Sequence, residues 1–122
     1  MMISFVIANF GIKPFVLECL RSLSNASCRE DAEVIVVDDG TPEPDWFRLR
    51  SEIAAQNLRV DKFIRLESNQ GFGAAMNAGI HEAHGELIVA LNSDCFVGRE
   101  VIVRLKQELP NLEPTAGFLA LP

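Results

Sequence analysis

Hydrophobic residues in this chain form two kinds of run, continuous ones and ones that recur every three or four positions. The continuous runs predict β-strands, because strands of a parallel sheet are buried on both faces. They are Met2–Ala8, Glu33–Val37, Lys62–Leu66 and Glu86–Leu91. We expect Lys62–Leu66 to lie nearer an edge of the sheet, because it is short and charged. The other three runs predict fully buried strands.

Between these runs, apolar residues recur at the spacing of one helix face. Four helices are predicted: Pro14 to Asn25, Trp46 to about Asn57, Phe72 to Ala83, and Val101 to Leu109. Alternating strands and helices predict an α/β fold, a Rossmann-like three-layer α/β/α arrangement around a mostly parallel sheet. We expect residues 1–122 to form a single domain, because a second core would leave both too small.

Charge and composition narrow the classes of ligand. Eleven basic and 17 acidic residues give a net charge of −6. With no Lys/Arg cluster, this argues against binding to duplex nucleic acid, so a phosphate group would need a metal ion or backbone amides. No transmembrane segment is predicted, since no apolar run approaches the required ~20 residues. Cys19, Cys28 and Cys95 form no CxxC pair, which favours reduced thiols and a cytoplasmic protein.

Polar residues follow three of the predicted strands, where ligands bind in parallel α/β sheets. Asn9 follows the first strand, and Asp38 and Asp39 follow the second. We expect one of these carboxylates to face the crevice and the other to face backbone amides. An alternative interpretation is a simple turn in which Thr41 caps the next helix.

Asn92, Ser93 and Asp94 follow the fourth predicted strand. Oxygen ligands on a tight loop suit Mg²⁺ or Mn²⁺. Because Asp94 is the one carboxylate of the three, a bound diphosphate would have to supply further oxygens. The alternative is again an ordinary turn.

A run of small residues spans 69–80. It lacks the GxGxxG pattern of dinucleotide-binding proteins. Its glycines allow a helix to pack closely on a sheet and leave amides free for phosphate. We expect Asn77, an amide among small and apolar side chains, to bond to a neighbouring loop.

Three segments resemble, in order and spacing, the inverting family 2 glycosyltransferases of the GT-A fold. They are EVIVVDDGT, NQGFGAAMNAGI and GELIVALNSDCFV. The resemblance runs from Ile3 to about Pro122. It implies a nucleotide-diphosphate sugar donor, UDP- or dTDP-linked, and sugar transfer with inversion at the anomeric carbon.

The resemblance also assigns residues to the donor site. It implies that Asp39 contacts the base and that Asp94 binds the divalent metal, Mg²⁺ or Mn²⁺. The other residues expected in the nucleotide-sugar site are Ala8, Asn9, Phe10, Asp38, Asn69, Gly71, Asn77, Asn92 and Ser93.

The sequence departs from the family pattern at several positions. Asn92 replaces the first acid of the DxD element, a variant seen in rhamnosyltransferase-like members. Met76 stands where an arginine is common, and Ala8-Asn9-Phe10 where Pro-Thr-Tyr is usual. The chain ends with the donor-binding half, so the catalytic base of the acceptor half has no counterpart, and we assign no catalytic residue.

Three functional hypotheses follow. The favoured one is a glycosyltransferase-like domain that binds a nucleotide sugar with a metal ion. The first alternative is a non-catalytic remnant or a fragment, acting as a binding or assembly subunit. The second, a small nucleotide-binding α/β module of another family, leaves the order of the motifs unexplained.

Other features carry structural expectations. The edge of the sheet beside the fourth strand would be exposed unless Gly117–Leu121 covers it, which predicts a homodimer or a partner subunit. His81 and His84 share a helix face, but nothing supplies a third metal ligand. Trp46 is expected to anchor the core rather than to stack on a sugar.

Overall fold

The computed structural model describes residues 2–12, 14–27 and 30–108. Strands and helices alternate along the chain, and each element predicted from the hydrophobic pattern is present within a few residues of its expected ends. The elements are β1 (Ile3–Asn9), α1 (Pro14–Ala26), β2 (Ala32–Asp38), α2 (Glu43–Ala55), β3 (Lys62–Arg65), α3 (Phe72–Glu82), β4 (Leu87–Asn92) and α4 (Arg99–Glu108).

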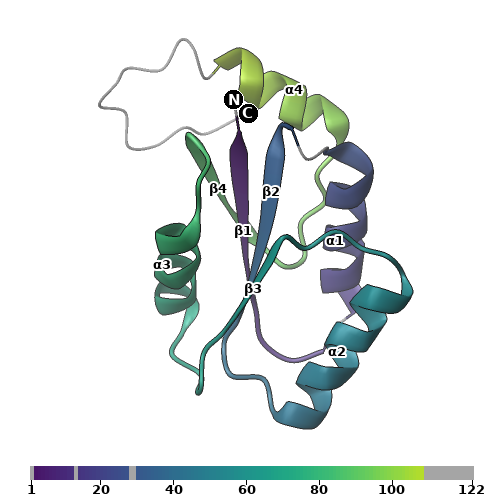
Figure 1. Ribbon diagram of the computed structural model, residues 1–122, viewed down its shortest axis with the longest axis vertical. Helices are drawn as coiled ribbons and strands as arrows, with labels where there is room; N and C mark the ends of the chain where they lie inside the picture. The colour runs from purple at the N-terminus through teal and green to yellow at the C-terminus, as the bar shows by residue number, and fades with distance from the viewer. Residues whose placement is uncertain (1, 13, 28–29, 109–122) are drawn as a thin grey trace.

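The four strands form one parallel sheet in the order β3-β2-β1-β4. Helices α1, α2 and α4 pack on one face of the sheet, and α3 packs on the other (Figure 1). The predicted α/β/α layering is therefore confirmed. The sheet order also confirms β3 as an edge strand.

Alternate residues of the central strands fill the two halves of the core. Phe5 and Val34 point toward α1, α2 and α4, whereas Val6 and Val37 point toward α3. A Cβ atom at Gly79 of α3 would lie 2.3 Å from Cγ1 of Val6. The small residues of α3 thus allow close packing on the sheet, as predicted.

Strand β4 corrects one expectation, since it is partly buried on one face and exposed on the other rather than buried on both. Leu87 and Val89 pack against the core beneath α1 and α4, whereas Ile88 on the opposite face is 37% exposed. The reason is that α3 lies over β1 and β2, and no other described helix covers this face of β4. Among the described residues, no strand pairs with the outer edge of β4. The segment expected to cover it, Gly117–Leu121, lies outside them.

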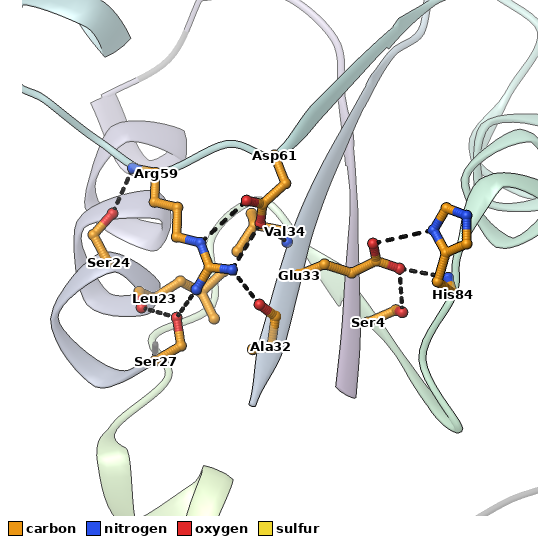
Figure 2. A network of polar contacts seen from close by, with 10 residues as sticks. All are labelled: Ser4, Leu23, Ser24, Ser27, Ala32, Glu33, Val34, Arg59, Asp61 and His84. Atoms are coloured by element: carbon orange, nitrogen blue, oxygen red, sulfur yellow. Dashed lines mark hydrogen bonds and ion pairs between the residues drawn. The ribbon is translucent and has the colours of Figure 1, made fainter. Parts of the chain in front are cut away.

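A cluster of polar side chains ties the amino end of the sheet to the α3–β4 connection (Figure 2). The Glu33 carboxylate accepts hydrogen bonds from the Ser4 hydroxyl (2.6 Å) and from the backbone N–H of His84. Burial acts to raise the pKa of Glu33, but these hydrogen bonds and the nearby His84 ring outweigh it, so the pKa lies below its usual value. His84 thus supports a turn, and no group of three metal-ligating side chains occurs in the described part of the chain.

A second cluster at the same end holds the loop before β3 (Figure 2). The Asp61 carboxylate accepts the Val34 N–H at 2.7 Å. Arg59 forms an ion pair with Asp61 (3.1 Å) and donates to the backbone oxygen of Ala32. These contacts fix the register between β2 and β3 and therefore the position of Arg65, the last residue of β3.

Candidate functional site

The predicted site residues on β1, β2 and β4 meet at the carboxyl edge of the sheet. In the parallel register, Asn9 lies beside Asp38 and Ala8 lies beside Asn92. Three strand ends that are separate in sequence are therefore aligned at one rim.

Asp38 supports this rim from within. Its side chain is fully buried, and its carboxylate accepts four hydrogen bonds. The donors are Asn9 Nδ2 (3.2 Å), the backbone N–H of Thr41 (2.9 Å), the Thr41 hydroxyl (2.6 Å) and an Arg65 guanidinium nitrogen (2.9 Å). In this conformation Asp38 holds other residues of the site and does not face a ligand.

Thr41 does not cap α2, which corrects the turn interpretation. The N-cap of α2 is Pro42, without a side-chain capping bond. The Thr41 hydroxyl instead donates to Asp38 and accepts the N–H of Gly11 at 2.8 Å. The Thr41 side chain thus joins the turn after β1 to the turn after β2.

The turn after β1 presents an aromatic side chain at the rim. Phe10 is 48% exposed. Its neighbours are held on both sides, since Asn9 Nδ2 donates to the backbone oxygen of Gly11 at 2.9 Å and Thr41 binds the Gly11 N–H. An exposed ring on a fixed turn suits stacking on a planar ligand.

Asp39 joins the DDG turn to the glycine-rich segment. Its carboxylate accepts the backbone N–H groups of Gln70 (2.7 Å) and Gly71 (2.9 Å), and its own N–H donates to the oxygen of Asn9 (2.8 Å). The side chain is almost buried, so both carboxylates of the pair face protein donors. Each oxygen keeps lone-pair capacity for a further donor such as a base N–H.

Gly40 allows the DDG turn and the NQG segment to approach each other closely. It has a positive φ of 83°, and a Cβ atom there would lie 2.4 Å from the carbonyl carbon of Ser68. Asn69, the next residue, is exposed at the rim. The DDG and NQG segments therefore act as one folded unit.

Asn77 corrects another expectation. Its side chain is exposed on α3 and has no hydrogen-bond partner among the described residues. The reason is the helical phase, since Met76 and Gly79 face the sheet and turn Asn77 away from it.

Asn92 is the last residue of β4, and Ser93 and Asp94 form the open turn that follows it. Asn92 and Asp94 are exposed and Ser93 is half-buried. The N–H of Cys95 donates to the oxygen of Asn92 at 3.2 Å, and the N–H of Val97 donates to the buried Ser22 hydroxyl of α1 at 3.0 Å. A single protein carboxylate fits a Mg²⁺ or Mn²⁺ ion when a bound diphosphate and water complete its shell.

Arg65 is the residue that sequence reasoning missed. It lies next to Asp38 in the β2–β3 register and forms an ion pair with it at 2.9 Å. Its guanidinium carbon lies 5.2 Å from the centre of the Trp46 ring. Trp46 is buried and packs edge-on against Phe63, which confirms it as a core anchor. The sequence carries no signal for the Arg65–Asp38 pair, because it depends on strand order and register.

The two described cysteines are free thiols. Burial raises the pKa of Cys19 to about 11, with the nearby Cys95 and Asp94 adding to the effect. Cys19 is therefore protonated at neutral pH and is a core residue rather than a nucleophile.

Comparison with known proteins decides the family. Residues 4–116 match glycosyl transferase family 2. The chain belongs to this family. It is 32% identical over 109 residues to the uncharacterized glycosyltransferase EpsJ of Bacillus subtilis. The alignment covers 88% of this chain and 30% of EpsJ.

Solved structures share the fold of this family 2 chain. It superposes on TarS 1-349 of S. aureus in complex with UDP-GlcNAc with a TM-score of 0.75, at 21% identity, over 91% of this chain and 32% of that one. It also superposes on the mannosyltransferase PcManGT of Pyrobaculum calidifontis in complex with GDP-Man and Mn²⁺, with a TM-score of 0.74 at 20% identity. This superposition covers 94% of this chain and 33% of PcManGT. The chain thus spans about a third of the length of these proteins.

Helices that cross membranes are long and apolar. None of the helices in the described ranges meets both conditions.

Proposed function

We propose that this chain is the donor-binding part of an inverting glycosyltransferase and binds a nucleotide-diphosphate sugar together with Mg²⁺ or Mn²⁺. The observation that carries the proposal is the alignment of Asp39 and Asp94 on either side of β1. Asp39 follows β2 and Asp94 follows β4, so the two sites are two strand spacings apart, about 10 Å. That span suits a nucleoside with its base at one end and its diphosphate at the other.

Each rim residue has a distinct role in this proposal. Asp39 accepts an N–H of the base with its remaining lone pairs, and Phe10 stacks on a planar part of the nucleotide. Asn69 and Gly71 form the wall of the base site, because Asp39 holds their loop in place. Asn92 and Ser93 shape the turn that presents Asp94.

Asp94 would hold the metal ion, with the donor diphosphate as the second source of ligands. When bound, a divalent ion supplies charge stabilisation to the leaving diphosphate. In the transfer, an acceptor hydroxyl oxygen forms a bond to the anomeric carbon while the bond from that carbon to the diphosphate breaks. The proton of the hydroxyl goes to a general base. We assign that base to no described residue.

The nature of the donor is also proposed. TarS and PcManGT, which share the fold, have been solved with UDP-GlcNAc and with GDP-Man. The Asn-Ser-Asp variant resembles rhamnosyltransferase-like members of the family and favours a UDP- or dTDP-linked sugar. The free thiols Cys19 and Cys95 favour a cytoplasmic location.

A second candidate function is a binding or assembly subunit that performs no transfer by itself. It is favoured by the outer edge of β4, with which no strand pairs among the described residues. This edge is the surface that would receive a second copy or a partner subunit. Transfer or hydrolysis of a donor sugar by this chain alone would exclude this candidate.

Calorimetric titration tests the donor site directly. UDP, dTDP and GDP are titrated into the protein with Mn²⁺, with Mg²⁺ and with EDTA. We expect metal-dependent binding of at least one nucleotide, and its loss in Asp94→Ala. Glu86→Ala is the matched control, because Glu86 is an exposed acid just before β4, at the opposite end of the sheet from Asp94. Failure of the wild-type chain to bind any of the three nucleotides would refute the proposal.

A further inference from the structure

The negative charge of a carboxylate buried beneath the rim of the site requires a positive charge nearby. Asp38 is fully buried, and its neutral donors from Asn9 and Thr41 do not offset its charge. Arg65 supplies the positive charge, at 2.9 Å from Oδ2. Burying an unpaired charge costs much more than burying a paired one, so the conformation around Asp38 depends on Arg65.

The guanidinium of Arg65 is held in place by its surroundings. The Trp46 ring lies 5.2 Å from it, and Trp46 is fixed edge-on against Phe63 with 5.8 Å between ring centres. The guanidinium carbon of Arg50 lies close to both rings, 4.7 Å from the centre of Phe63 and 5.7 Å from the centre of Trp46. With 29% of its side chain exposed, Arg65 packs as part of this stack and presents one nitrogen to Asp38.

Contacts lead from Arg65 to the two turns of the donor site. Asp38 binds both Asn9 and Thr41, and each of these binds Gly11. Phe10 lies between Asn9 and Gly11 and therefore has both neighbours fixed by this network. Asp39 directly follows Asp38, so its carboxylate starts from the same fixed backbone.

We propose that Arg65 is a positioning residue of the donor site, which acts through Asp38 to fix the turns that carry Phe10 and Asp39. The inference rests on the proposed function, since it concerns the geometry of the same nucleotide site. It adds a residue from β3, outside the three sequence motifs. Lysine is a poor substitute here, because it lacks the planar group that stacks on Trp46 while donating to Asp38.

Four variants test this role: Arg65→Lys, Arg65→Met, the double variant Arg65→Met/Asp38→Asn, and the control Arg104→Met. Arg104 is exposed on α4 and forms no ion pair among the described residues. Urea unfolding midpoints are measured first. Dissociation constants for UDP, dTDP and GDP with Mn²⁺ are then measured by calorimetry under conditions where each variant is folded.

We expect Arg65→Met to weaken the nucleotide that binds the wild type by about tenfold or more, which corresponds to about 1.4 kcal/mol. Arg65→Lys is expected to weaken it several-fold while its unfolding midpoint stays near that of the wild type. A role in folding alone would leave the affinity of this variant unchanged. The double variant removes the buried charge together with its partner and should recover most of the lost affinity, whereas Arg104→Met should bind as the wild type does.

Wild-type affinity in both Arg65→Lys and Arg65→Met would overturn the inference and leave the proposed function intact. If Arg65→Met does not fold, the affinity of Arg65→Lys decides in the same way. A double variant that binds no better than Arg65→Met would also overturn it. Absence of nucleotide binding by the wild-type chain would overturn the inference and the proposed function together.

Discussion

The amino and carboxyl ends of the sheet both contain acidic side chains that accept hydrogen bonds, but the two ends differ in what surrounds these acids. At the amino end, the buried Asp31 pairs with Arg99 (2.7 Å), and Glu33 accepts donors from Ser4 and His84. At the carboxyl end, Asp38 and Asp39 accept side-chain and backbone donors in the same manner. At both ends the acids fix connections between strands and helices.

The difference lies in what surrounds these acids. The carboxyl end also carries exposed groups, which are Phe10 on the turn after β1, Asn92 at the end of β4 and Asp94 just after it. In the proposed function, a ligand would meet these exposed groups, of which Phe10 lies on a turn that Asp38 holds through Asn9 and Thr41. Buried acids occur at both ends of the sheet, so the proposed donor site rests on their combination with aligned, exposed side chains.

The largest effect should come from removing the buried acid of the carboxyl end. We expect Asp38→Ala to destabilise the fold by about 3–5 kcal/mol, because it leaves Arg65 without its ion-pair partner and the Thr41 N–H without its acceptor. Urea unfolding measures the change. Asp31→Ala is the matched variant at the amino end, and it should cost less, because Arg99 and Lys106 can turn to solvent. Equal losses would contradict the special dependence of the carboxyl end on its buried acid.

The next largest loss of stability is expected from substituting two glycines at the carboxyl end of the sheet. Gly40 and Gly11 have nearly equal positive φ angles of 83° and 85°, but a Cβ atom at Gly11 meets nothing within 4 Å. We expect Gly11→Ala to cost about 1–2 kcal/mol from backbone strain alone. Gly40→Ala should cost about 2–4 kcal/mol, because it adds a clash with the Ser68 backbone. Comparing the unfolding midpoints of Gly11→Ala and Gly40→Ala separates the cost of backbone strain from the cost of the clash. Equal costs would show that the loop at Ser68 moves aside without a penalty.

Glu33 makes the stability of the amino end dependent on pH. Glu33→Gln is expected to cost about 1–2 kcal/mol at pH 7, from weaker hydrogen bonds to Ser4 and His84. Because the folded-state pKa is lowered, this contribution is present above the unfolded-state pKa of about 4.3 and is lost as the pH falls through the folded-state value. Urea unfolding between pH 3 and pH 7 should show the difference from wild type shrinking in acid. A difference that stays constant over that range would contradict this role, and Glu86→Gln serves as the control.

The smallest effect on stability is expected at the residue proposed to matter most for the ligand. Asp94 is exposed, so Asp94→Asn should change the free energy of unfolding by less than about 0.5 kcal/mol. Its metal-dependent nucleotide binding should nevertheless be lost. A clear loss of stability would show instead that Asp94 supports the turn after β4, like the acids of the amino end.

Much of the fold was predictable because local patterns encode it. Continuous apolar runs such as Ile3–Asn9 are typical of strands buried by helices on two sides, and the spacing of Phe72, Ala75, Met76 and Gly79 is typical of a helix on a sheet. The apolar composition of β4 resembles that of β1 and predicts a fully buried strand, but β4 is only partly buried. Its exposure depends on where α3 lies, and no local pattern encodes that.

Within the site, the sequence indicated which strand ends carry polar groups but not how those groups are used. Thr41 is a good capping residue, yet a buried carboxylate next to it offers a stronger partner than the α2 N-terminus. Asn77, an amide among small and apolar residues, is expected to bond to a neighbouring loop, but the helical phase turns it to solvent. In both cases long-range packing overrode a local preference.

The sequence by itself determined the alternation of strands and helices, the polar strand ends and the family, because these depend on residue spacing along the chain. The tertiary structure decided that β1 lies between β2 and β4, which sets Asp39 and Asp94 on either side of Phe10. It also decided that Asp38 is a buried support compensated by Arg65 on a neighbouring strand. The physical reason is that burial and ion pairing join residues distant in sequence, and their energies depend on the positions of the strands in space.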